Sequence, residues 1–354
     1  MNKVTHWQPL LDFAQRHACP WSFDPDSSGN EWGIHQLDDP PHNRLLGPVF
    51  SRGGPAGIIL KEGEVLCQWG DIDRPDMTFS VTKTYLALTA GVAFDQGLLT
   101  DLDEPVYRRL PDIGFETEHN QTITWRHFLH FTSEWEGKCF GVPDQIDRYR
   151  LLGFQPDTHT QRKGDPRPLK TPGTYWEYND IRINQFSYAL LHLFKRPLPD
   201  VFGETVMLPL AASNTWQWHG YENSWCNIEG IDMQSVPGGG HWGGGMVISA
   251  RDQTRVAQLL MNQGMHAGQQ VISTEWISLM LTPCPIAPFY GFFTWLNTDH
   301  VISKSASPKS YFALGIGGQL IWHDPDQNLS AVLRWINSER TEDYIQLING
   351  LLRN

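Results

Sequence analysis

Apolar residues recur every three to four positions in several stretches of the chain, which is the period of an amphipathic helix. The spacing predicts a helix near the start, a second that opens at a serine, others further along, and a closing helix. Ser249 stands directly before one of these stretches, where its hydroxyl can cap a helix. The expected helices span residues 5–18, 80–98, 124–131, 179–194, 249–264 and 339–353.

Runs of strand-forming residues lie instead near the two ends of the chain. Glu62-Gly63-Glu64 separates the first two runs, which predicts a β-hairpin. Turn residues such as Asp324-Pro325-Asp326 bound the later runs. The expected strands span residues 57–60, 65–69, 289–296, 317–323 and 329–336.

This order of elements indicates an α/β (α+β) fold, with an antiparallel sheet flanked by N- and C-terminal helices. The sheet domain is expected at residues 1–78 and 246–354, and a mainly helical domain is inserted at residues 79–245. A cleft between two such regions is the usual place for a site. Residues 19–55 are rich in Pro, Gly, Asp and Asn, which is typical of a long ordered loop.

Charge and composition exclude some classes of partner. The formal net charge is −12, which disfavours nucleic acid and anionic lipid, and the chain has no run of 18 apolar residues to span a membrane. Five scattered cysteines and an N-terminus without an apolar signal core favour a reduced, cytoplasmic protein. The 15 tryptophans are expected mainly as core anchors, with an aromatic-lined cleft as the alternative.

Ser80 and Lys83 are the first candidates for chemistry. Residues three apart share one helix face, so Lys83 can bring its amine near the Ser80 hydroxyl. A serine needs a base or a local charge to become a good nucleophile, and N–H groups at a helix start can stabilise an oxyanion. Lys83 alone among the lysines has a serine three positions earlier. The Ser-x-x-Lys motif is weak by itself, and a plain amphipathic helix start is the alternative.

Four segments in order strengthen this interpretation: FSVTK at 79–83, GLLTDLDEPV at 97–106, ITWRHFL at 123–129 and PGTYWEYND at 172–180. Together they resemble the β-lactamase-like serine hydrolases, which include class C β-lactamases, DD-peptidases, related esterases and aminohexanoate-oligomer hydrolases. The resemblance covers most of the chain from Gly54 onward and the first 50 residues least. It implies a β-lactamase/transpeptidase-like fold.

The resemblance implies that Tyr178 completes a catalytic set with Ser80 and Lys83. A phenolate, or a phenol that shares its proton with Lys83, can act as general base for acylation and as acid for the leaving group, whereas a packed tyrosine at a helix entry is the alternative. The family's asparagine falls on Asp180, which would pair with Lys83 and keep it charged. The base role is therefore assigned to Tyr178. A carboxylate that merely stabilises the first helical turn is the plainer interpretation of Asp180.

The family's third motif, Lys-Thr-Gly or His-x-Gly, corresponds to ALGIGG at residues 313–318. Gly315 is kept, and a glycine there lets a substrate approach the backbone. By analogy, the N–H groups of Ser80 and Ile316 would form the oxyanion hole. Ala313 replaces the charged residue, which removes a contact for a substrate carboxylate. Lys309 or His241 are possible substitutes.

His241 and Trp242 stand in a glycine-rich bend at residues 238–245. A histidine among glycines can lie exposed beside a cleft and contact substrate, and a turn with one surface ring is the alternative. The histidines show no metal-ligand spacing, so no metal is predicted. No cofactor is predicted either, because no convincing phosphate or dinucleotide motif occurs.

These residues predict a serine hydrolase that cleaves an ester or a small amide through an acyl-Ser80 intermediate, as a cytoplasmic esterase or amidase. β-Lactamase or D-Ala-D-Ala peptidase activity is less favoured because Ala313 is uncharged. A non-catalytic binding module on the same fold is the third interpretation, which Asp180 and Ala313 suit and the intact Ser80–Lys83 pair does not. The expected partner is a small ester or amide, and no pattern indicates an oligomeric state.

Overall fold

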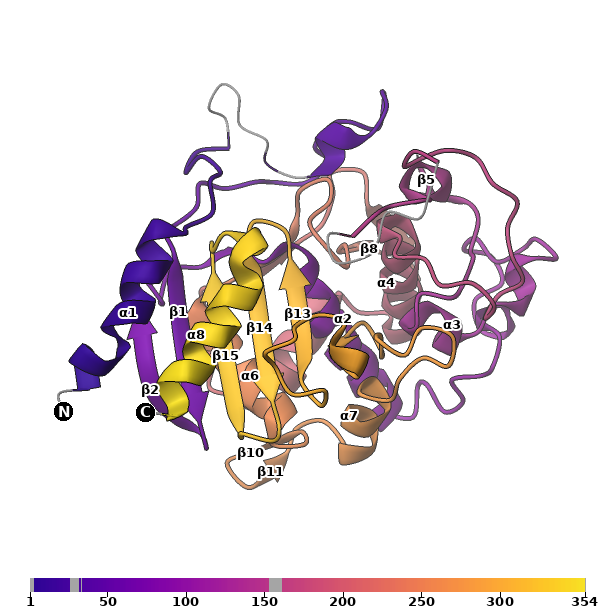
Figure 1. Cartoon of the computed structure of the whole chain (residues 1–354). Helices are drawn as coiled ribbons and strands as arrows, with labels where there is room; N and C mark the ends of the chain where they lie inside the picture. Colours follow the sequence, from indigo (N-terminus) through magenta and orange to yellow (C-terminus); the bar gives the residue numbers. More distant parts are fainter. Residues whose placement is uncertain (1–2, 26–31, 33, 153–160, 354) are drawn as a thin grey trace.

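A six-stranded antiparallel sheet forms one side of the molecule in the computed structural model, which describes residues 3–25, 32, 34–152 and 161–353 (Figure 1). Its strands, in spatial order, are β12 (Trp295–Leu296), β13 (Tyr311–Gly315), β14 (Gln319–Asp324), β15 (Leu329–Arg334), β1 (Ala56–Lys61) and β2 (Glu64–Trp69). Strands from the two ends of the chain pair directly, because Ala56 lies opposite Arg334 and Lys61 opposite Leu329. The predicted fold class, an antiparallel sheet built from both ends of the chain, is confirmed.

Three of the predicted helices cover the two faces of this sheet. The first, α1 (Lys3–Arg16), and the last, α8 (Thr341–Arg353), lie against each other, and α8 crosses in front of β14 and β15 in Figure 1. On the far face, α6 (Ala250–Met261) packs on β15 and β1. Ser249 caps α6 as expected, because its hydroxyl accepts from the Asp252 N–H at 3.1 Å.

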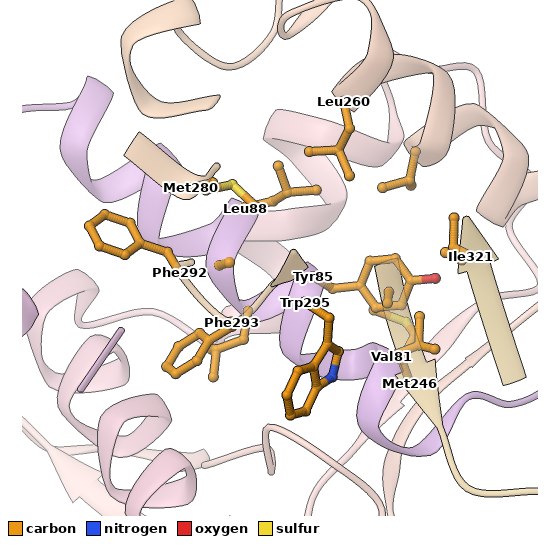
Figure 2. Close-up of a cluster of buried hydrophobic side chains, with 14 of the residues drawn as sticks. Val81, Tyr85, Leu88, Met246, Leu260, Met280, Phe292, Phe293, Trp295 and Ile321 are labelled. Carbon is orange, nitrogen blue, oxygen red and sulfur yellow. The ribbon is translucent and has the colours of Figure 1, made fainter. Parts of the chain in front are cut away.

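A buried helix, α2 (Thr82–Asp95), joins the sheet to the rest of the molecule. Its side chains are buried on all sides from residue 82 to 93, as expected for a helix that is apolar all round. Figure 2 shows Tyr85 and Leu88 of this helix among apolar side chains from several other elements. The helix begins two residues later than predicted, because residues 79–81 form a 3₁₀ turn that carries Ser80. Its helical neighbours are α4 (Asp180–Phe194), α5 (Leu198–Phe202) and α7 (Thr274–Met280).

The region from 100 to 245 is less helical than predicted. Where it is described, it holds α3 (Trp125–Leu129), α4, α5, a short π-type turn and three 3₁₀ turns (Val106–Arg108, Asn120–Thr122 and Asp144–Asp147), and loops and short strands make up the rest. Buried ion pairs, such as those of Glu134 with Arg167 and Arg182, fix these loops in place of helical hydrogen bonds. The domain boundaries stay a prediction. Outside the six-stranded sheet, the short strands of the described chain, in this region and beyond it, are β3 (Asp76–Met77), β4 (Lys138–Cys139), β5 (Val142–Pro143), β6 (Gln217–His219), β7 (Trp225–Ile228), β8 (Ile231–Gln234), β9 (Gly245–Ile248), β10 (Met265–His266) and β11 (Gln269–Gln270).

The strand predicted at 289–296 is wrong except for its last two residues, which form β12. Its backbone serves helix ends instead of a sheet: the Phe292 N–H donates to the Met280 carbonyl at 3.0 Å, and the Phe293 N–H to the Leu129 carbonyl at 3.0 Å. These carbonyls end α7 and α3, where helical partners run out. The same run of apolar residues suits a buried loop as well as a buried strand, so the sequence pattern alone does not separate the two.

The predicted loop at 19–55 is hydrogen-bonded both to the end of the large sheet and to the glycine-rich bend at 238–245. The Cys19 N–H donates to the Trp335 carbonyl at 2.7 Å, and the Leu46 N–H to the Trp242 carbonyl at 2.8 Å. One 3₁₀ turn, Ile34–Leu37, interrupts it, and residues 26–31 and 33 lie outside the described residues. None of the helices in the described ranges combines the length and apolar content needed to cross a bilayer.

Candidate active site

Ser80 follows a residue in a strained conformation. Phe79 has φ +49°, in the left-handed region that a bulky side chain rarely adopts. Its buried ring lies 5.8 Å from Trp21, 6.5 Å from Trp32 and 6.0 Å from Trp335, measured between ring centroids. This aromatic cluster, half of it from the N-terminal loop, holds the turn that presents the partly exposed Ser80.

The amine of Lys83 lies 3.0 Å from Ser80 Oγ and 2.6 Å from a carboxylate oxygen of Asp180. Burial opposes the ammonium form, but the charges of Asp180 and Tyr178 outweigh it, so the pKa of Lys83 is raised. The expected pairing of Asp180 with Lys83 is therefore present, and Lys83 is charged at neutral pH. Gly239 makes room for this arrangement, since a Cβ there would lie 2.8 Å from Lys83 Nζ.

Tyr178 lies beside the same amine. Its ring centroid is 4.7 Å from Lys83 Nζ and 5.0 Å from the guanidinium carbon of Arg150. The ring stacks between Phe131, at 4.8 Å and an interplanar angle of 27°, and Trp295, at 5.6 Å and 15°. Tyr178, almost a hundred positions further along the chain, thus meets the Ser80–Lys83 pair in one place.

A pocket of about 290 Å³ opens over these residues. Gly315 brings the end of β13 against the serine turn: a Cβ there would lie 2.4 Å from the Thr78 carbonyl oxygen and 3.4 Å from the Ser80 nitrogen. A larger hollow, of about 640 Å³, lies elsewhere beside β6 and holds none of the predicted catalytic residues. The lining residues of the smaller pocket are Leu37, Ser80, Arg150, Leu151, Leu152, Lys163, Tyr178, Trp295, Leu314, Gly315 and Ile316.

His241 and Trp242 do not lie exposed beside the cleft, which corrects the prediction that they contact substrate. His241 is 2% exposed and Trp242 is 1% exposed, and the two rings stack at 3.9 Å. The His241 ring lies between two carboxylates, 3.0 Å from Asp180 and 2.9 Å from Asp38. Close backbone packing of the glycine-rich bend draws the ring inward, since a Cβ on Gly243 would lie 2.2 Å from the Gly47 carbonyl oxygen.

Asp180 is likewise buried, at 1% exposure, and lies behind the pocket wall, which corrects its placement among the substrate-binding residues. It belongs to a buried network that sequence reasoning largely missed. We call this network the serine-side cluster: Asp38, Lys83, Asp147, Arg150, Lys163, Asp180 and His241.

The members of this cluster that sequence reasoning missed come from three separate loop positions. Arg150 lies 2.5 Å from Asp180 and 3.3 Å from Asp147, and Lys163 lies 3.2 Å from Asp147 and also pairs with Asp38. The spacing of Asp147 and Arg150 is the one available signal, because side chains three apart can pair within a turn. Nothing in the sequence connects Asp38 to residues more than a hundred positions away.

The cluster favours ionised carboxylates. Burial raises the pKa of Asp180, but Arg150, Lys83 and His241 outweigh it and hold that pKa well below its usual range. Asp147 shows the same balance, with Arg150 and Lys163 lowering its pKa against burial. Asp147, Asp180 and His241 offer ligand atoms within 4.8 Å of one another, which is a spacing that a metal could use. Arg150 and Lys163 already fill that position as cations, so the residues do not suit a metal.

The sheet, the covering helices and the buried serine-bearing helix are the fold of β-lactamases and transpeptidases. The model of the family described as Beta-lactamase matches residues 77–346, which is most of the chain. The protein therefore belongs to the Beta-lactamase family, whose members hydrolyse amide and ester bonds.

Individual relatives are distant. The chain is 21% identical over 325 residues to a 6-aminohexanoate-dimer hydrolase from Paenarthrobacter ureafaciens, covering 84% of this chain and 76% of that protein. The hydrolase EstCE1, described as having promiscuous acyltransferase activity, matches with a TM-score of 0.61 and 15% identity over 99% of this chain and 97% of its own. A beta-lactamase from Mycobacterium bovis matches with a TM-score of 0.59 and 18% identity over 84% and 94%. At these identities, the structures establish the fold alone.

Proposed function

We propose that this protein hydrolyses an ester or a small amide through a covalent acyl intermediate on Ser80. The observation that carries the proposal is the 3.0 Å contact between Lys83 Nζ and Ser80 Oγ at a pocket that Tyr178 also lines. A serine beside a buried cation and a phenol has the partners that an activated nucleophile requires.

In the proposed reaction, Ser80 Oγ attacks the acyl carbon while Tyr178, acting as a phenolate beside the Lys83 ammonium, accepts the hydroxyl proton. The bond from the acyl carbon to the leaving oxygen or nitrogen then breaks, and the leaving group takes up that proton. A water molecule next attacks the acyl-Ser80 ester, which releases the acid and returns a proton to Ser80. Lys83 stays charged throughout and stabilises developing negative charge, together with the N–H groups of Ser80 and Ile316.

The names of the relatives, a 6-aminohexanoate-dimer hydrolase and a hydrolase with promiscuous acyltransferase activity, do not separate an ester from an amide substrate. We favour these substrates over a lactam or a cell-wall peptide because Ala313 occupies the charged position of the third motif. All five cysteines are free thiols, which supports the proposed cytoplasmic location.

The test combines covalent labelling with turnover. A fluorophosphonate should add one adduct to the wild type by intact mass, and p-nitrophenyl butyrate should be hydrolysed faster than nitrocefin. Ser80→Ala should lose the adduct and at least about a thousandfold in kcat/KM, as expected for a removed nucleophile. Ser278→Ala, on the exposed face of α7, is the matched control and should change neither. An adduct that survives Ser80→Ala would contradict the proposal.

A further inference from the structure

The wall of the serine pocket is apolar around its mouth. Three of its apolar side chains are among the large hydrophobic groups that this protein exposes to solvent: Leu37 at 76%, Leu151 at 43% and Ile316 at 36%. Leu152, Trp295 and Leu314 continue the same wall. Exposed apolar side chains that gather at one opening mark a surface for an apolar ligand.

Two cations interrupt this wall, and both are already paired. The Arg150 guanidinium contacts Asp147 and Asp180, and the Lys163 amine contacts Asp38 and Asp147. The carboxylates lie on the buried side, with Asp147 at 0% exposure and Asp180 at 1%. Each cation therefore directs its charge away from the pocket and into the protein.

The charges of the serine-side cluster cancel. Lys83, Arg150 and Lys163 face Asp38, Asp147 and Asp180, with the His241 ring between two of the carboxylates. The cluster thus has no spare cation for a substrate carboxylate. The charged residue of the third motif, a second possible partner for a substrate carboxylate, is also missing. Ala313 stands at that position and is buried in β13.

Asp38 helps to neutralise the charge of Lys163. It lies outside residues 77–346, the part of the chain that matches the family model. It pairs with Lys163, accepts from Trp242 Nε1 at 3.1 Å and contacts the His241 ring. The neighbouring Leu37 forms part of the pocket wall. One short stretch of the N-terminal loop thus supplies both an apolar surface and a neutralising carboxylate.

We propose, resting on the hydrolase function above, that the pocket selects substrates whose acyl group is apolar and uncharged, and that Asp38 enforces this selection by neutralising Lys163. A substrate with a terminal carboxylate would exchange its hydration for a wall whose described residues offer no unpaired cation, and this desolvation is costly. An apolar acyl group gains from the same wall by burial.

Two esters of equal acyl length test the selection: p-nitrophenyl hexanoate and mono-p-nitrophenyl adipate, each corrected for spontaneous hydrolysis. The wild type should show a kcat/KM at least about tenfold higher for hexanoate, as for one unpaired buried charge. Asp38→Asn keeps the side-chain shape and leaves Lys163 less neutralised, so it should shift the ratio toward adipate at least about fivefold. Asp39→Asn, one position along, removes the same charge from an exposed pair with Arg162 and should leave the ratio unchanged.

A second variant keeps the test open should Asp38→Asn fail to fold. Leu37→Lys adds a cation at the exposed mouth without touching the buried network, and it should also move the ratio toward adipate. Leu208→Lys, at a leucine that is 74% exposed and remote from the pocket, is its matched control. Preference of the wild type for adipate, or a ratio that neither variant moves, would overturn this inference alone. Absence of turnover with both esters and of any Ser80 adduct would instead overturn the hydrolase function.

Discussion

Two buried ion clusters meet at the start of α4, and they differ in what they touch. The serine-side cluster contacts Ser80 through Lys83. The second, which we call the loop cluster, consists of Glu134, Asp144, Arg148, Arg167, Glu177 and Arg182. Each cluster pairs three Lys or Arg side chains with three carboxylates. Asp180 belongs to the first and Arg182 to the second, so two positions in the first turn of one helix serve different networks.

The loop cluster makes several hydrogen bonds to the backbone, whereas the serine-side cluster, in which Asp147 accepts from the Asp180 N–H, also contacts the Ser80 hydroxyl. Glu134 accepts from the Lys170 N–H at 2.8 Å, Glu177 accepts from the Tyr149 N–H at 3.1 Å, and Arg182 donates to the Trp135 carbonyl at 3.0 Å. These bonds fix the long loops that replace the expected helices. The same ionic chemistry thus acts on stability in one place and, in our proposal, on catalysis and selectivity in the other.

The largest expected effect is on turnover in the serine-side cluster. Lys83→Met keeps the stem but removes the charge beside Ser80, so kcat/KM for p-nitrophenyl butyrate should fall about a thousandfold. In Lys83→Met, Asp180 keeps Arg150 and His241 as partners. The free energy of unfolding should therefore fall far less than in Arg182→Met, the loop-cluster variant. Lys309→Met, in an exposed pair with Asp326, is the control for both readouts. Near-normal turnover in Lys83→Met would remove the proposed role of Lys83.

The second effect is on stability in the loop cluster. Arg182→Met leaves Glu134 and Glu177 buried with fewer cations, which should lower the free energy of unfolding by about 3–5 kcal/mol. Urea denaturation measures this loss. The folded fraction should still take the fluorophosphonate adduct on Ser80, and Arg196→Met in an exposed pair should cost little. A stable Arg182→Met protein with impaired labelling would reverse the roles of the two clusters.

The smallest effect is an acid dependence that belongs to the loop cluster. Burial raises the pKa of Glu134, but the hydrogen bond from Arg167 and the charge of Arg182 outweigh it and lower that pKa to about 2. Because the folded pKa lies below the unfolded one, this stabilisation is complete above the ordinary pKa of 4.5 and is lost as the pH falls toward 2. The free energy of unfolding should drop by about 2 kcal/mol from this group between roughly pH 6 and pH 3.

Glu134→Gln should weaken the dependence of the free energy of unfolding on pH in the acid range. Glu229→Gln, in an exposed pair with Lys195, should keep the wild-type dependence. If the free energy of unfolding fell equally with pH in the wild type and in Glu134→Gln, the acid sensitivity would belong to other carboxylates.

Helix-face spacing predicted the contact of Ser80 with Lys83, whereas the place of Tyr178 beside them and the β-lactamase-like fold were implied by the resemblance of the ordered motifs to a known family. Turn chemistry also located the first hairpin. The strand expected at 289–296 failed because its apolar side chains pack in a loop whose N–H groups complete two helices. Its sequence carries no sign of which partner the backbone finds.

The buried networks were largely beyond sequence reasoning. Asp38 and His241 are separated by 203 positions, and nothing in their local pattern distinguishes them from surface residues. Loops without periodicity give no direction for a side chain, so Arg150 and Lys163 carried no sign that they reach the pocket. The role of Gly239 was partly visible in the sequence, because a run of glycines indicates close packing. The run does not show that Gly239 packs against Lys83.

The pairing of β1 with β15 constrains when this protein can fold during its synthesis. Ala56 leaves the ribosome long before Arg334, so the hairpin of β1 and β2 waits with one open edge while about three quarters of the polypeptide is made. Only β15, made about 260 residues after β2, closes the sheet against the β1 edge. Until then, an unpaired strand edge is available to other chains, which makes early release or truncation a route to aggregation.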